Sequence, residues 1–208
     1  FIAWPEGDFV RLLFHELAHQ VVYAPGDTLF NESFATAVER LGSAQWLATQ
    51  STPQARQAFA TSDARRSAFR ALTRTTRARL SVIYEQKEAL ALDEKALAAM
   101  KTEAMQSFRS DYAALRAGWL EAPSDRPTAM NAPQLAGYDR WVAHANNASF
   151  AAQAAYDELV PAFEALFARE GRQWPRFYDA VRQLAKQPET QRHQSLRALS
   201  PPKESPGA

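Results

Sequence analysis

Apolar residues recur every three or four positions along most of this 208-residue chain, a spacing that predicts α-helices. No stretch alternates apolar and polar residues over the length of a strand, and the chain has only 7 glycines. The first helix is expected over residues 8–22, with Asp8 as its N-cap. Its apolar stripe, typical of a helix packed on a core, consists of Phe9, Leu12, Leu13, Leu17 and Val21.

A short turn separates this helix from a second one. Pro25 and Gly26 interrupt the helical pattern, and either Asp27 or Thr28 can cap the helix that follows. That second helix is expected to carry residues 31–49. Because the turn is short, it can fold the second helix straight back on the first.

The pattern then predicts a long antiparallel helical hairpin over residues 54–120. Helical spacing continues through residues 54–92 and again through 94–118, and Asp93 between them is suited to cap the second helix. Six arginines in the first of these helices stand among few aromatic residues, which favours a solvated face paired with acids over a nucleic-acid surface. They are Arg65, Arg66, Arg70, Arg74, Arg77 and Arg79.

Composition and charge narrow the choice of function class. The formal net charge is +1, which gives no indication of binding to nucleic acid or to an anionic membrane. The chain has no cysteine, which excludes disulfides and thiolate metal sites, and no apolar run approaches the ~20 residues of a membrane-spanning helix. It opens at Phe1 without a methionine or a basic segment, so we expect a signal, an anchor or further structure before Phe1 in the full-length protein.

The segment His15-Glu16-Leu17-Ala18-His19 carries the candidate chemistry. Two histidines four residues apart on a helix differ by about 40° around its axis, so both imidazoles can reach one metal ion. Imidazole nitrogens are preferred zinc ligands. Glu16 projects beside such a metal, where it can act as the base that takes a proton from a metal-activated water.

A catalytic zinc of this kind needs a third protein ligand and one open position. Glu32 and Glu39 are the two candidates, on nearly the same face of the second helix. Glu32 is preferred because a helix that folds straight back places its first residues near His19. Glu39 lies ~10 Å further along that helix. We expect Asn31 to cap a helix or support the ligands rather than bind the metal.

These motifs resemble a bacterial family named "putative aminopeptidase", which is regarded as zinc-dependent and is often attached to the cell envelope as a lipoprotein. The resemblance covers most of residues 9–187 and rests chiefly on residues 14–20, 26–28 and 30–35. It implies a gluzincin-like pair of metal helices, peptide substrates, and a periplasmic location with a membrane anchor outside this chain. Its C-terminal part is carried by Tyr138, Trp141, Asn146, Asn147, Ala148, Tyr156, Pro161, Ala162, Phe163, Phe177 and Tyr178.

The same C-terminal part suggests further site residues. Peptide hydrolysis needs a donor to the developing oxyanion, and Tyr156 is the preferred candidate over Tyr138 and His144. Asn146 and Asn147 either bind the substrate backbone or cap a helix. An aminopeptidase must also hold a free α-amino group, and Glu39 is a candidate anchor if it is not a metal ligand.

We therefore expect an all-α fold that combines a gluzincin-like metal-binding helix pair with a long antiparallel hairpin. His193 lies in a polar tail and is expected to be inert. A loop over residues 121–137 is predicted from its prolines, with short helices after it. The four expected regions are metal-binding helices 1–53, hairpin 54–120, C-terminal helices 121–187 that complete the catalytic domain, and a disordered tail 188–208.

Two other functions compete with a zinc peptidase. The chain can be a catalytically silent envelope scaffold or peptide-binding module that keeps its zinc, since a long alanine-rich hairpin suits partner binding. The metal can also be a structural staple between two helices. The staple is disfavoured because Glu16 would then have no role and because structural zinc sites close with four protein ligands.

Overall fold

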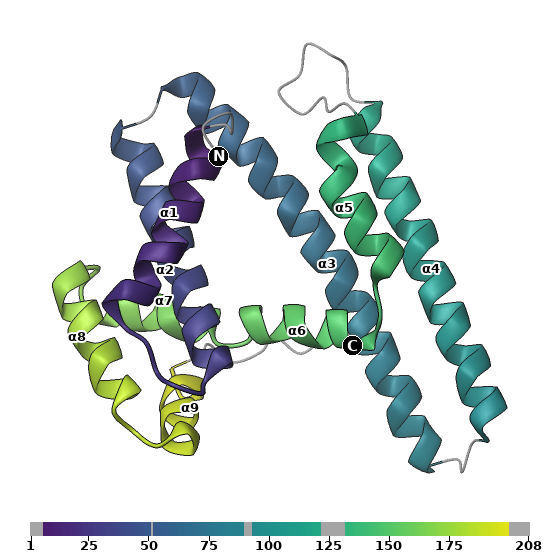
Figure 1. The fold of residues 1–208 in the computed structure, drawn as a ribbon. Helices are drawn as coiled ribbons and strands as arrows, with labels where there is room; N and C mark the ends of the chain where they lie inside the picture. Colours follow the sequence, from purple (N-terminus) through teal and green to yellow (C-terminus); the bar gives the residue numbers. More distant parts are fainter. Residues whose placement is uncertain (1–5, 51, 90–92, 122–131, 200–208) are drawn as a thin grey trace, which may run out of the picture. The chain divides into compact units, whose positions relative to one another are not determined.

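The computed structural model describes residues 6–50, 52–89, 93–121 and 132–199. Within these ranges the chain forms nine α-helices and no strand, so the prediction of an all-α fold is confirmed (Figure 1). The chain divides into two compact units, which we call the site unit (Phe1–Arg56 with Gln153–Ala208) and the hairpin unit (Gln57–Ala152). None of the helices in the described ranges combines the length and the apolar character needed to cross a bilayer.

The site unit is built around an aromatic core. Phe34 lies at its centre, with ring centroids 5.7 Å from Phe163 and 6.0 Å from Phe177, and all three rings are fully buried. Such a core links the N-terminal helices to the C-terminal ones and supplies most of the burial that stabilises the unit. The helices of this unit are α1 (Glu6–Val21), α2 (Thr28–Gln50), α7 (Val160–Arg169), α8 (Trp174–Ala185) and α9 (Glu189–Arg197).

The turn between α1 and α2 is fixed by three short-range features. Gly26 has a φ of 83°, in the left-handed region that favours glycine. Asp27 Oδ1 accepts a 2.9 Å hydrogen bond from Phe30 N, so Asp27, one of the two predicted candidates, caps α2. The side chain of Asn31 bonds both N and O of Ala24, each at 2.8 Å. Together these contacts set how α2 folds back along α1.

Only part of the apolar stripe predicted for α1 faces the core, where Val21 packs. Phe9, Leu13 and Leu17 are 42%, 44% and 50% exposed. The buried residues of α1 include Gly7, Arg11 and Ala18, whose spacing defines a different face of the helix. Small residues here let the helices approach closely: a Cβ on Gly42 of α2 would lie 3.0 Å from the ring of Phe14. Close helix packing, rather than burial of the largest side chains, therefore orients α1.

The C-terminal segment differs from the predicted disordered tail, because residues 189–197 form α9. Leu196 is fully buried in the core of the site unit. His193 Nε2 and Arg192 Nη1 lie 2.9 Å and 3.0 Å from Asp27 Oδ2. A buried ion-pair cluster at the α1–α2 turn thus anchors a segment whose polar composition gave no sign of burial. Residues 200–208 of the predicted tail lie outside the described residues.

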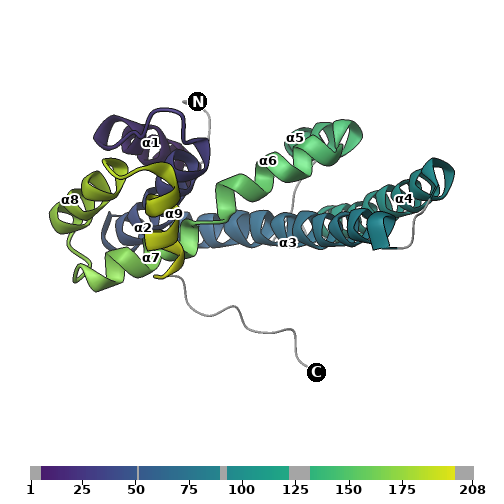
Figure 2. The ribbon, with the colours of Figure 1, turned by 90° about the horizontal axis from the view of Figure 1, so that it is seen from below.

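The hairpin unit contains the long helices predicted from the sequence. Figures 1 and 2 both show α3 and α4 side by side and antiparallel. Asp93 caps α4 by accepting a 2.7 Å hydrogen bond from Ala96 N, as predicted. Rings of Phe69 and Tyr112 join the two helices, with centroids 6.0 Å apart. The helices are α3 (Pro53–Ala89), α4 (Glu94–Leu120), α5 (Ala132–His144) and α6 (Asn147–Asp157).

Two predicted boundaries change. The predicted loop 121–137 is already helical from Ala132, because Pro133 falls in the first turn of α5, where its missing N–H is tolerated. Residues 122–131 of that loop lie outside the described residues. The predicted region 121–187 is also not one unit, because α5 and the first part of α6 belong to the hairpin unit.

An ion pair that joins α4 to α5 predicts a measurable acid sensitivity. Asp139 accepts hydrogen bonds from Tyr112 Oη at 2.6 Å and from Arg116 Nε at 2.9 Å. The hydrogen bonds from Arg116 and Tyr112 lower the pKa of the Asp139 carboxyl. A carboxyl whose pKa is lowered in the folded state stabilises the protein at pH values above its unfolded-state pKa of about 3.9. This stabilisation is lost as the pH falls from there through the folded-state pKa.

We therefore expect Asp139→Asn to lower the free energy of unfolding at pH 7, and the difference from wild type to shrink as the pH falls toward 3. Urea unfolding at a series of pH values measures this difference. Asp111→Asn is the matched control, because Asp111 is an exposed carboxylate of α4 whose hydrogen-bond partner is the hydroxyl of Ser107. A difference for Asp139→Asn that is independent of pH would contradict the assignment.

Candidate metal centre

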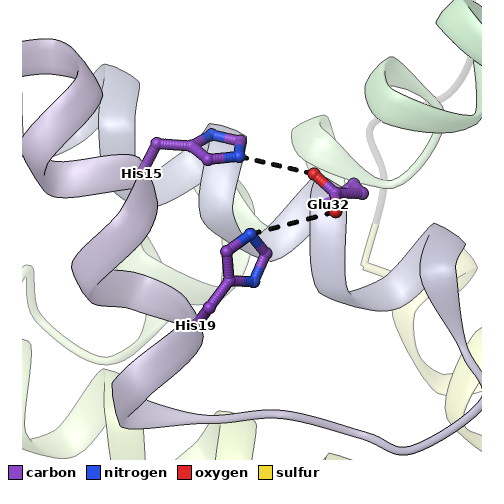
Figure 3. Close-up of side chains that lie close together, drawn as sticks. All are labelled: His15, His19 and Glu32. Carbon is purple, nitrogen blue, oxygen red and sulfur yellow. Dashed lines mark ion pairs between the residues drawn. The ribbon is translucent and has the colours of Figure 1, made fainter.

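Two antiparallel helices bring His15, His19 and Glu32 together. The histidines project from one face of α1, and Glu32 projects toward them from the first turns of α2 (Figure 3). His15 Nε2 lies 3.4 Å from Glu32 Oε2, and His19 Nε2 lies 3.9 Å from Glu32 Oε1. The two imidazole rings meet edge to face with centroids 5.2 Å apart. One potential ligand atom from each residue lies within 4.8 Å of the others.

The donor set and its spacing fit a zinc ion. Tetrahedral zinc with bonds of about 2.0–2.1 Å separates its ligand atoms by roughly 3.3 Å, close to the two distances found here. All three side chains are about one-fifth exposed, so solvent reaches the group. These three side chains could hold a zinc ion, and three protein ligands with one open position are the pattern of a catalytic rather than a structural zinc.

The predicted base Glu16, and Asn31, which precedes Glu32, also have defined positions. Glu16 follows His15 on α1 and is exposed, so its carboxylate is available to a solvent-borne reactant. Asn31 precedes Glu32, is buried, and uses its amide to close the α1–α2 turn. Asn31 therefore supports the ligand helix, in the manner expected from the sequence.

Glu39, the alternative ligand, lies against the other nitrogen of His15. Glu39 Oε2 is 3.0 Å from His15 Nδ1, and Glu39 Oε1 accepts a hydrogen bond from Arg11 Nε. Burial raises the pKa of Glu39, but the hydrogen bond from His15 and the charge of Arg11 outweigh it, so the pKa is lowered. The hydrogen bond to Glu39 in turn raises the pKa of His15, against the opposing effect of burial.

The oxyanion candidates and the two asparagines are placed elsewhere in the chain. Tyr156 lies in α6, and its side chain is outside the described part of the structure. Tyr138 and His144 belong to α5 of the hairpin unit. Tyr138 packs on Phe69 with ring centroids 4.9 Å apart, and His144 Nδ1 lies 2.8 Å from the carbonyl oxygen of Arg140.

Asn146 and Asn147 have local partners within the hairpin unit. Asn146 Oδ1 accepts a 3.1 Å hydrogen bond from Ser149 N, which is a capping contact at the start of α6. Asn147 Nδ2 donates to the Tyr84 hydroxyl of α3. The sequence leaves two roles open for these asparagines, substrate binding and helix capping, and Asn146 makes a capping contact.

The sequence model of a protein family described as "Putative aminopeptidase" matches residues 1–196. The chain belongs to this family. The matched residues include α1 and α2, the hairpin helices and α7 to α9. The match is therefore not limited to the helices that carry His15, His19 and Glu32. An aminopeptidase family implies a peptide substrate. Neither a search of curated proteins nor a search of solved structures found a match to the chain.

Proposed function

We propose that this chain is a zinc-dependent peptidase, and within its family an aminopeptidase. The observation that carries the proposal is the convergence of His15 Nε2, His19 Nε2 and the Glu32 carboxylate from two helices. Neutral imidazoles with one carboxylate are a common donor set of catalytic zinc in peptidases. The Nε2 atoms of both imidazoles face the same carboxylate, so one ion placed among them could contact all three side chains.

Each residue then has a role in hydrolysis. When bound, zinc supplies Lewis-acid chemistry that polarises a carbonyl and acidifies water. Glu16 takes a proton from the water that adds to the scissile carbonyl carbon, and it returns that proton to the amine nitrogen as the C–N bond breaks. His15, His19 and Glu32 would hold the ion, and the exposed position of Glu16 leaves its carboxylate accessible to water.

The cellular location follows the family resemblance alone. We propose that the full-length protein works in the periplasm as a membrane-anchored lipoprotein. Fractionation of cells that express the full-length protein measures its location, and recovery in the cytosol would contradict this proposal.

From the same resemblance we propose that Tyr156 donates a hydrogen bond to the developing oxyanion. A Tyr156→Phe variant with unchanged kcat would contradict this role.

Metal analysis and peptide hydrolysis together test the proposed function. We expect about one zinc per chain in the wild type, release of single residues from unblocked peptides, and loss of both zinc and activity in Glu32→Ala. Glu170→Ala, on a carboxylate paired with Arg169 and Arg176, is the matched control and should keep both. A wild type that holds zinc without cleaving any peptide in a library would favour the silent binding module. A wild type that binds no zinc would overturn the proposal.

A further inference from the structure

His15 lies between two carboxylates of the same helix, and each faces a different ring nitrogen. Glu32 approaches Nε2 at 3.4 Å, and Glu39 approaches Nδ1 at 3.0 Å. Glu39 lies seven positions after Glu32, which places the two about two turns apart on one side of α2. The imidazole is thus oriented from both ends by one helix.

The contact with Glu39 decides which nitrogen carries the proton. An ionised carboxylate accepts hydrogen bonds but cannot donate them, so Nδ1 must be the protonated nitrogen of the neutral ring. The lone pair then lies on Nε2, the nitrogen that faces Glu32 and the proposed metal. His19 provides a contrast, because its Nδ1 has no hydrogen-bond partner among the described residues.

Arg11 keeps the Glu39 carboxylate ionised although it is largely buried. Arg11 lies one turn before His15 on α1, and its Nε donates to Glu39 Oε1. Both side chains have low exposure, so water solvates the carboxylate poorly and the guanidinium takes over that role. His15 and Arg11 each contact one oxygen of this largely buried carboxylate, which favours an orienting role for Glu39 over binding a metal or a substrate amino group.

We propose that Arg11 and Glu39 form a positioning pair that holds His15 in the tautomer with hydrogen on Nδ1 and presents Nε2 to the metal. This inference rests on the proposed zinc site for its functional meaning, while the tautomer itself is a property of the metal-free protein. Glu39 is then neither the third ligand nor the anchor of the substrate amino group. Carboxylates in this position typically contribute 10–100-fold to metal affinity.

The first test measures the tautomer directly. Long-range 15N–1H NMR spectra of the metal-free chain at pH 9 distinguish hydrogen on Nδ1 from hydrogen on Nε2, and the spectrum of His15→Gln assigns His15 among the 4 histidines. We expect hydrogen on Nδ1 of His15 in the wild type and a loss of that preference in Glu39→Ala. Hydrogen on Nε2 in the wild type, or an unchanged tautomer in Glu39→Ala, would overturn the inference.

The second test measures zinc affinity by competition with a chelator. We expect affinity to fall about 10–100-fold in Glu39→Ala, and also in the near-isosteric Arg11→Met/Glu39→Gln double variant, which leaves no unpaired buried charge. Glu39→Asp should recover part of the loss, and Glu170→Ala should match the wild type. Circular dichroism at the assay temperature confirms that each variant is folded.

The outcomes separate this inference from the proposed function. An affinity of Glu39→Ala within threefold of wild type would overturn the positioning role and leave the zinc site intact. Complete loss of zinc in Glu39→Ala, equal to that in Glu32→Ala, would make Glu39 a ligand and equally overturn it. If the wild type binds no zinc, the proposed function fails, and the tautomer measurement still decides whether Glu39 orients His15.

Discussion

Replacing Glu16 by glutamine is expected to lower kcat for peptide hydrolysis by about 10²–10⁴-fold while one zinc per chain remains bound. A carboxamide has nearly the size of a carboxylate but cannot accept the proton of the attacking water. Glu16 contributes no atom to the group formed by His15, His19 and Glu32, so metal binding should survive. Steady-state hydrolysis of an unblocked peptide, with metal content measured on the same sample, gives both quantities.

The control for this variant is Glu6→Gln, on an exposed acid in the first turn of the same helix. It should keep kcat within about twofold, because it changes net charge equally without touching the proposed centre. Full activity in Glu16→Gln would place the base on another residue. Loss of zinc in Glu16→Gln would instead mean that Glu16 belongs to the metal-binding set.

Replacing Asp27 by alanine is expected to lower the free energy of unfolding by about 3–5 kcal/mol. Asp27 Oδ2 is the carboxylate partner of both Arg192 and His193, and its Oδ1 caps α2. The variant leaves a buried guanidinium without its counter-charge and a helix start without its cap, and both losses are costly. Urea unfolding of the metal-free chain measures the change without a contribution from zinc.

Asp179→Ala is the control for this prediction, because Asp179 also pairs with an arginine, Arg182, but on the surface of α8. Exposed pairs contribute about 0–1 kcal/mol, so the control should change little. A loss below about 1 kcal/mol in Asp27→Ala would show that α9 is held by its apolar contacts alone. The zinc affinity of Asp27→Ala should also fall, since Asp27 caps α2 five positions before Glu32.

The metal helices could be predicted from the sequence because their signals are local. Pro25 and Gly26 break the helix, Asp27 caps the next one, and the histidine spacing fixes one face of α1. Each of these depends on residues only a few positions apart. The preference for Glu32 over Glu39 as the third ligand rests on the same reasoning and stays a prediction, with Glu32 3.4 Å from His15 and 3.9 Å from His19.

Features that depend on contacts distant in sequence were missed. Arg11 is one such residue: it shares the face of α1 that carries Ala18 and lies one turn from His15, and this spacing is the only local signal that points to it. The exposed Phe9, Leu13 and Leu17 show that a row of large apolar residues need not mark the packed face. Local signals did not reveal the burial of α9, because its partner Asp27 lies 166 positions before His193.

The site unit is assembled from two stretches of chain with the whole hairpin unit between them. This order determines when the α1–α2 turn can gain its contacts with α9 during synthesis. Asp27 and His193 are 166 positions apart. At ribosomal rates of about 5–20 residues per second, roughly 10–30 s pass between the two. Throughout that interval the nascent metal helices lack their C-terminal partners, so a chaperone or an early-binding ion would meet α1 and α2 before α9 exists.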